Sequence, residues 1–210
     1  MIIAVDGPTA SGKGTISKAL AKHYGLPWLD TGLLYRAVGR QVALNGANAD
    51  NSVEAVAACT FPDSLLDDPA LRDEATGGLA SRVSVHPEVR AALNKRQVDF
   101  ANQPAGAVLD GRDIGTVIAP QADVKLFVTA SAEIRAERRF KEMQARGATV
   151  DYETILADIR ARDKRDTERA NAPLKPAEDA HLLDTGNLTI GAAVQRAIAL
   201  VDAKIENRPK

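Results

Sequence analysis

The chain has 210 residues, of which 45% are hydrophobic and 26% are charged, and its formal net charge is −1. This balance disfavours strong sequence-independent binding to nucleic acid, and the single cysteine, Cys59, excludes an internal disulfide framework. No apolar run is long enough to span a bilayer, and the opening "MIIAVDG" lacks the basic region of a signal peptide. We expect a cytoplasmic protein that binds neither nucleic acid nor a membrane and acts as a monomer.

Short apolar runs recur along the chain, and each leads through a turn into a longer segment. Five of these runs predict strands: "IIAV" at 2–5, "LPWLD" at 26–30, "GAVLD" at 106–110, "VKLFVTA" at 124–130 and "HLLDT" at 181–185. Most of the longer segments have helical periodicity, and this alternation is typical of a parallel sheet with crossover helices. The predicted fold class is therefore α/β, with a five-stranded parallel sheet and helices on both faces.

Two regions interrupt this alternation. Residues 46–103 contain no convincing strand and have the polar, alanine-rich composition of helices, whereas residues 141–173 are highly charged. A charged run of this kind is ordinarily a solvated helix with ion pairs between successive turns. We expect residues 1–45, 104–140 and 174–210 to form the core domain, residues 46–103 to form an insertion, and residues 141–173 to form a lid and the helix that follows it.

A glycine-rich loop lies between the first predicted strand and the first predicted helix, which is the context of a phosphate-binding P-loop. Glycines let the backbone turn so that several N–H groups face one anion, and the helix N-terminus adds partial positive charge. Lys13 is a mobile cation for the outer phosphates, and the hydroxyl of Thr15 is a candidate direct ligand of Mg²⁺. The residues expected to bind ATP here are Gly7, Pro8, Thr9, Ala10, Ser11, Gly12, Lys13, Gly14 and Thr15.

The order of residues in this loop narrows the class of nucleotide-binding protein. Gly14 stands where the common P-loop pattern has Ser or Thr, and "GKGT" resembles nucleoside monophosphate kinases more than GTPases or motor ATPases. Asp110 closes the third predicted strand and is a candidate to hold Mg²⁺ through water. An aspartate that only caps a turn is the alternative for this position.

A second group of polar residues follows the next strands. "LDTGLLYR" places Thr31 as the expected N-cap of a helix and Arg36 on that helix, and "DGRD" places Arg112 and Asp113 after the third strand. Ligands of open α/β sheets bind at the edge formed by the carboxyl ends of the strands. The planar fork of arginine suits a terminal phosphate, so these residues predict a second phosphate site. An arginine in a surface ion pair is the alternative for each.

Five segments, in this order, resemble the bacterial cytidylate kinases, which phosphorylate CMP and dCMP. They are "VDGPTASGKGT", "LDTGLLYR", "ASRVSVHPEVR", "DGRDIGT" and "RDKRDTERANAPL", and the resemblance runs from the first strand through the last helix. It implies phosphoryl transfer from ATP with Mg²⁺, an insertion that binds the nucleoside monophosphate, and a lid. Many members carry a small sheet in the insertion, but this insertion is short and shows no hairpin, so we expect it to be helical.

The resemblance also assigns roles by position. It places Ser81, Arg90 and Asp113 at the cytosine, Asp166 at the sugar, and Arg139 at the lid entrance, where ATP would lie. The residues that it implies for acceptor binding are Thr31, Arg36, Ser81, Arg90, Arg112, Asp113, Arg162, Asp166 and Arg169. Those expected to act in catalysis are Lys13, Asp110, Arg112 and Arg162.

Two alternatives remain open. The chain could be a kinase of the same fold that acts on UMP, AMP, shikimate or gluconate, which the acceptor residues, chiefly Arg90 and Asp113, would decide. It could also be a nucleotide-binding switch or regulatory ATPase that moves a partner protein. The second phosphate site and the arginine-rich lid argue against the switch, because a switch has no acceptor to hold.

Overall fold

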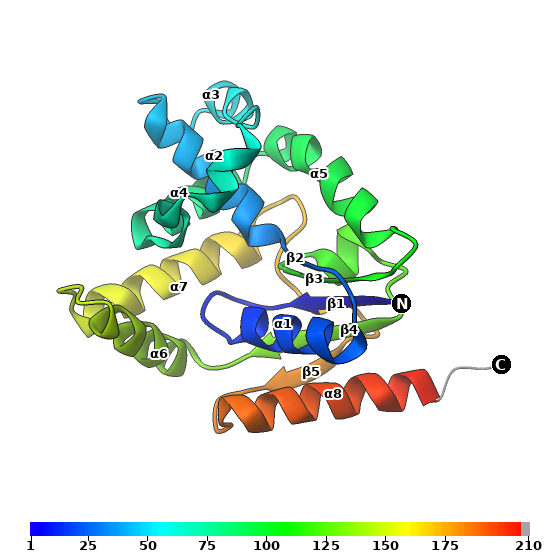
Figure 1. The fold of residues 1–210 in the computed structure, drawn as a ribbon. Helices are drawn as coiled ribbons and strands as arrows, with labels where there is room; N and C mark the ends of the chain where they lie inside the picture. Colours follow the sequence, from blue (N-terminus) through cyan, green and yellow to red (C-terminus); the bar gives the residue numbers. More distant parts are fainter. Residues whose placement is uncertain (207–210) are drawn as a thin grey trace.

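The computed structural model describes residues 1–206 and contains a parallel sheet with the strand order β2-β3-β1-β4-β5 (Figure 1). The strands are β1 Ile2–Asp6, β2 Trp28–Asp30, β3 Ala107–Gly111, β4 Val124–Thr129 and β5 His181–Asp184. All five predicted strands are present and pair in parallel, so the predicted α/β fold is confirmed. Residues 207–210, which end the expected core segment, lie outside the described residues.

Helices cover both faces of the sheet, as the unbroken burial of its inner strands requires. Helices α1 Lys13–Tyr24 and α8 Ile190–Glu206 pack on one face, where Ile3 and Val5 of β1 point. Helix α5 Pro87–Ala101 and the short helix η3 Ile114–Ile118 cover the other face, where Ala4 points. Successive residues of β1 therefore point to opposite apolar layers, as the two-residue period of a strand dictates.

The insertion is built from helices, as expected. It contains α3 Ser52–Ala57, the 3₁₀ turns η1 Asp63–Asp67 and η2 Pro69–Arg72, and α4 Glu74–Val83, with no strand among residues 46–103, and it ends in α5, which packs on the sheet. These elements share an apolar cluster with α2 Thr31–Leu44, in which Leu34 and Val38 pack with Ala80 and Val83. Helices α2, α3 and α4 form the upper part of the molecule in Figure 1.

The charged region forms much of a helical hairpin. Helices α6 Ala132–Ala145 and α7 Tyr152–Glu168 pack on each other through a small apolar cluster that includes Ile155 and Ile159. Ser131 caps α6 and Asp151 caps α7, each accepting a hydrogen bond from a backbone N–H of the first turn. The hairpin lies beside the loop between β1 and α1 (Figure 1).

The parallel strands bring their carboxyl ends to one edge of the sheet. The loops that follow β1, β2 and β3 lie at this edge, and α4 of the insertion packs against α7 of the hairpin. The edge is therefore enclosed by segments that are far apart in the sequence. Within residues 1–206, no helix is both long enough and apolar enough to cross a membrane.

Candidate active site

The glycine-rich loop after β1 has the backbone that an anion site requires. A Cβ atom at Gly7 would lie 2.0 Å from the carbonyl oxygen of Val128, so only glycine allows the loop to approach β4 this closely. Gly12 has a φ of 89° and occupies the N-cap of α1, where no side chain caps the helix, and the first turn of α1 carries no acidic residue. The N–H groups of this turn can therefore bind an anion.

Lys13, in the first turn of α1, lies among the charged side chains of Arg112, Asp110 and Asp30. Its Nζ donates a hydrogen bond to the carbonyl oxygen of Pro8 at 3.3 Å, so its side chain folds back over the loop. Burial, and next the charge of Arg112, lower the pKa of Lys13 to about 8, whereas the carboxylates of Asp110 and Asp30 oppose this shift. Lys13 therefore stays largely protonated at neutral pH despite its surroundings.

Asp110 of β3 and Asp30 of β2 are directly opposite each other in the register of the two strands. Burial, and next the charge of Asp30, raise the pKa of Asp110 to about 7, and its Oδ2 accepts a hydrogen bond from the Trp28 indole Nε1 at 2.8 Å. This partner was not predicted from the sequence. It holds the Asp110 side chain toward β2, so the two carboxylates occupy one edge of the sheet.

The donor atoms near the loop suit Mg²⁺. They are the carboxylate oxygens of Asp30 and Asp110, which lie near Lys13, and the hydroxyl of Thr15, an exposed residue in the first turn of α1. Within the described part of the chain, no group of three or more His, Cys, Asp or Glu side chains is placed to hold a metal ion. Mg²⁺ typically takes one or two protein carboxylates and completes its shell with water and substrate phosphates, so this donor set fits an ion that arrives with a nucleotide.

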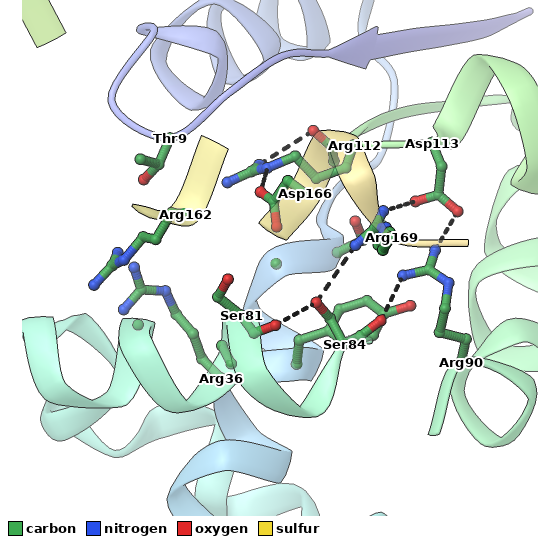
Figure 2. A pocket seen from close by; sticks show the side chains of 16 residues that line it. Thr9, Arg36, Ser81, Ser84, Arg90, Arg112, Asp113, Arg162, Asp166 and Arg169 are labelled. Carbon is green, nitrogen blue, oxygen red and sulfur yellow. Dashed lines mark hydrogen bonds and ion pairs between the residues drawn. The ribbon is translucent and has the colours of Figure 1, made fainter. Parts of the chain in front are cut away.

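A pocket extends from the P-loop to α5, with about 570 Å³ of empty space, part of it open to solvent. Every residue that the sequence predicted for acceptor binding lines the pocket, together with Thr9 of the P-loop, and Figure 2 shows many of these side chains converging on it. They come from α2, α4, α5, α7 and the segment after β3.

One end of the pocket contains a buried ion pair. Arg90 Nη2 donates to Asp113 Oδ2, and the Arg90 guanidinium lies 5.4 Å from the centroid of the Tyr35 ring. Arg169 Nη2 is buried without a hydrogen-bond partner among residues 1–206 and lies 3.9 Å from Asp113 Oδ1. Its Nη1 donates to Ser84 Oγ at 3.4 Å. This end therefore offers a carboxylate and an unused arginine donor to a polar ligand (Figure 2).

The other end is a cluster of cations. A Cβ atom at Gly77 would lie 2.8 Å from Arg36 Nη2 and 2.9 Å from Arg162 Nη1, so the two guanidinium groups converge above this glycine. Burial, and next the charge of Arg162, lower the pKa of Arg36 to about 10. Glu74 bridges the cluster, because it pairs with Arg162 and its Oε2 accepts a hydrogen bond from Arg139 Nε at 2.8 Å. This arrangement suits the binding of a multiply charged anion.

Polar contacts join the two ends. Arg112 Nε donates to Asp166 Oδ2 at 2.9 Å, and Arg165 Nε of α7 donates to Ser81 Oγ of α4 at 3.1 Å.

The prediction that Thr31 caps α2 was wrong, because Asp30 occupies the N-cap. The Thr31 hydroxyl instead donates to the carbonyl oxygen of Asp110 at 2.8 Å, which anchors the start of α2 to β3.

Two arginines of α6 contact the loop after β1 and the segment after β5. Arg135 is buried, donates to the Thr9 carbonyl oxygen at 3.2 Å and forms two hydrogen bonds with Asp163 of α7. Arg138 donates to the hydroxyl and carbonyl oxygens of Thr185, whose hydroxyl donates to the carbonyl oxygen of Ser11 at 3.0 Å. These contacts tie α6 to the P-loop. Arg139, which was expected near ATP, lies in the Glu74 cluster.

Several residues of the site were not singled out from the sequence. Tyr35 follows Thr31 by four residues, and Ser84 follows Ser81 by three residues, so helical spacing could have drawn attention to both. Glu74 carries no such signal, because its arginine partners Arg139 and Arg162 lie 65 and 88 residues away.

Comparison with known proteins gives one family. The family model described as cytidylate kinase matches residues 3–203. The cytidylate kinase of Xanthobacter autotrophicus is 57% identical over 99% of this chain and 100% of that protein. The cytidylate kinase of Brucella suis biovar 1 is 52% identical over 96% of this chain and 92% of that protein.

Solved structures with lower identity share the fold. A gluconokinase from Sinorhizobium meliloti has a TM-score of 0.53 and 16% identity, and the match covers 98% of this chain and 94% of that one. An uncharacterised protein from Eubacterium ventriosum has a TM-score of 0.57 and 17% identity, and the match covers 97% of this chain and 98% of that one. At these identities the likeness shows the fold alone.

Proposed function

The chain belongs to the cytidylate kinase family, and we propose that it transfers the terminal phosphoryl group of ATP to CMP and dCMP, yielding CDP and dCDP. The observation that carries this proposal is the single pocket that joins Thr9 of the P-loop to the buried pair of Arg90 and Asp113. A kinase needs a donor site and an acceptor site in one cavity, because the two phosphates must meet for direct transfer.

The P-loop binds ATP in this proposal. The N–H groups at the start of α1 bind the outer phosphates together with Lys13, whose side chain already folds over the loop. Arg139 lies in the Glu74 cluster and, in this proposal, exchanges its Glu74 contact for contact with substrate phosphate.

The acceptor lies along the pocket with its phosphate at the cation cluster. Arg36, Arg112 and Arg162 bind the phosphate, because their guanidinium groups match its oxygens in pairs. Asp166 binds the sugar, and the other end of the pocket binds the cytosine. The base-binding residues in this proposal are Ser81, Arg90, Asp113 and Arg169.

The reaction is an in-line displacement. An oxygen of the acceptor phosphate attacks the γ-phosphorus of ATP, and the bond from that phosphorus to the oxygen bridging it to the β-phosphate breaks, so that ADP leaves. The acceptor phosphate is already ionised at neutral pH, so no general base is required. Lys13, Arg112 and Arg162 neutralise the charge that spreads over the moving group and the leaving oxygen.

Mg²⁺ is the metal that these residues fit. Thr15 would hold it directly, and Asp110 would hold it through water with Asp30 beside it. When bound, the ion neutralises phosphate charge and orients the outer phosphates of ATP. The raised pKa of Asp110 indicates that this carboxylate gains from a nearby cation, since burial and Asp30 otherwise disfavour its charge.

The insertion and the lid exclude water from the transfer. The apolar cluster shared by α2, α3 and α4, and the cluster between α6 and α7, contain no residue of the sheet, which supports movement of these two groups of helices relative to the sheet. Closure over both substrates protects the phosphoryl group from hydrolysis.

A panel of acceptors tests the proposal. ADP formation would be measured with ATP, Mg²⁺ and, in turn, CMP, dCMP, UMP, AMP, shikimate and gluconate. Rapid turnover with CMP and dCMP is expected. A preference for another acceptor would place the chain with the other kinases of this fold. ATP turnover that does not depend on any acceptor would instead support the regulatory ATPase.

A further inference from the structure

Asp6 is a buried carboxylate that the proposed reaction does not use. It ends β1, directly before the P-loop, and does not line the pocket. Its Oδ1 accepts a hydrogen bond from the N–H of Ile114, and its Oδ2 accepts one from the N–H of Gly115, each at 2.8 Å. Asp6 therefore binds the backbone of the segment that carries Arg112 and Asp113.

These two bonds replace the cap that η3 would otherwise have. Asp113 stands at the N-cap of η3 but makes no side-chain hydrogen bond to its backbone. An aspartate at an N-cap ordinarily accepts hydrogen bonds from the first N–H groups of its own helix. Here Asp6 accepts from these groups, and the Asp113 carboxylate is free to pair with Arg90 in the pocket.

The electrostatic surroundings allow both oxygens of Asp6 to accept. Burial raises the pKa of Asp6 to about 6, although the hydrogen bonds from Gly115 and Ile114 oppose this shift. Of the neighbouring charges, Asp113 raises the pKa and Arg112 lowers it. The group is therefore largely ionised at neutral pH, in the form that can accept from two amides at once.

We propose that Asp6 is a positioning residue that holds residues 112–115 so that Asp113 can read the nucleobase of the acceptor. This inference rests on the proposed function of the pocket. The same residue ends the strand that leads into the P-loop, so one carboxylate sets the placement of the base-reading segment relative to the donor site. Small errors in such placement are costly, because a shift of about 1 Å can lower the rate by about 10²-fold.

Asp6→Asn tests the inference with little change in size. The amide oxygen of asparagine can accept from one N–H, but its NH₂ group must face the other N–H, so one hydrogen bond is lost. Asp123→Asn is the matched control, since Asp123 Oδ2 accepts from the Ile2 N–H at the opposite end of β1. The measurements are kcat/KM for CMP and for UMP, KM for ATP, and thermal unfolding of each variant.

The expected result is a loss of base selectivity. In Asp6→Asn, kcat/KM for CMP should fall by about 10- to 100-fold, and the CMP:UMP ratio should fall with it, while KM for ATP changes by less than about threefold. Asp123→Asn should leave the CMP:UMP ratio unchanged. The double variant of Asp6→Asn with Asp113→Asn should have the same ratio as Asp113→Asn alone, because Asp6 acts through Asp113.

Other outcomes would overturn the inference. Equal losses for CMP and UMP with a large rise in KM for ATP would mean that Asp6 supports only the P-loop. An unchanged CMP:UMP ratio in Asp6→Asn would remove the inference while leaving CMP kinase activity in the wild type intact. Wild type without CMP activity would remove the proposed function as well. If Asp6→Asn is unfolded, Asp6→Ser, which keeps one acceptor oxygen, should lower the ratio, and an unchanged ratio there would equally overturn the inference.

Discussion

Arg90 and Asp113 form a buried ion pair at one end of the pocket that we propose for the acceptor, although they lie 23 positions apart in the chain. Their side chains are only 8% and 6% exposed, so whatever binds beside them must satisfy their remaining hydrogen-bonding groups. Cytosine offers an amino donor to the carboxylate and an N3 acceptor to the guanidinium. Uracil reverses both groups, which would leave the carboxylate facing an oxygen.

Asp113→Asn should therefore narrow the difference between CMP and UMP. In the wild type we expect kcat/KM for CMP to exceed that for UMP by about 10²-fold or more, because unpaired buried polar groups cost a few kcal/mol. The asparagine amide can rotate to offer a donor to uracil, so the ratio should fall while CMP activity also falls. Steady-state kinetics with both acceptors measure this, and an unchanged ratio would show that Asp113 does not read the base.

Lys13→Ala should lower kcat by about 10³-fold, with little effect on folding. The reason is that Lys13 is a cation folded over the P-loop, where phosphoryl transfer develops negative charge. Lys22→Ala, at an exposed position near the end of the same helix, is the control and should keep normal turnover. A folded Lys13→Ala variant with nearly normal kcat would remove the P-loop assignment.

Glu74→Gln should make the cation cluster more receptive to anions. The substitution removes the carboxylate that bridges Arg139 and Arg162, so the unfolding free energy should fall by about 1–3 kcal/mol. Added sulfate should then stabilise this variant more than the wild type, because the ion replaces the lost negative charge. Chemical unfolding at increasing sulfate concentration measures both effects.

Glu142→Gln is the control for that experiment. Glu142 of α6 also pairs with Arg139, but its side chain is 44% exposed. Its other partner is Arg146, at the end of the same helix. Its loss should change stability little, as for exposed ion pairs in general. An equal response to sulfate in the wild type and in Glu74→Gln would show that Glu74 does not occupy an anion site.

Asp110→Asn should change how stability depends on pH. Burial raises the pKa of Asp110 in the folded wild type to about 7, so the folded protein binds a proton at Asp110 more tightly than the unfolded chain does. Protonated Asp110 stabilises the folded state at about pH 4, and this contribution is lost as the pH rises through about 7. The variant, which cannot ionise, should therefore gain stability relative to the wild type between these values, by up to about 4 kcal/mol.

Urea unfolding at several pH values between about 4 and 8 measures this difference. The asparagine oxygen can still accept the hydrogen bond from Trp28, so the packing of β2 on β3 should survive. Asp67→Asn, at an exposed position, is the control and should follow the pH dependence of the wild type. A constant difference between Asp110→Asn and the wild type would mean that Asp110 is not protonated more readily in the folded state.

The fold could be predicted from the sequence because its signals are local. Each strand is a short apolar run beside a turn, and the P-loop glycines lie in consecutive order between a strand and a helix, so neighbouring residues contain the information. The parallel arrangement then brings the ends of β1, β2 and β3 to one edge. That is why residues predicted separately, such as Arg36 and Asp113, line one pocket.

The contacts within the pocket could not be predicted, because they join residues far apart in the chain. Nothing near Glu74 in sequence indicates that it lies between arginines of α6 and α7, and nothing near Asp6 indicates that it caps a segment 108 residues later. Even Thr31, which has a typical capping side chain, donates to β3 and leaves the N-cap to Asp30. Local pattern specifies which backbone forms, whereas the partner of a charged side chain depends on which elements the folded chain brings within hydrogen-bonding distance.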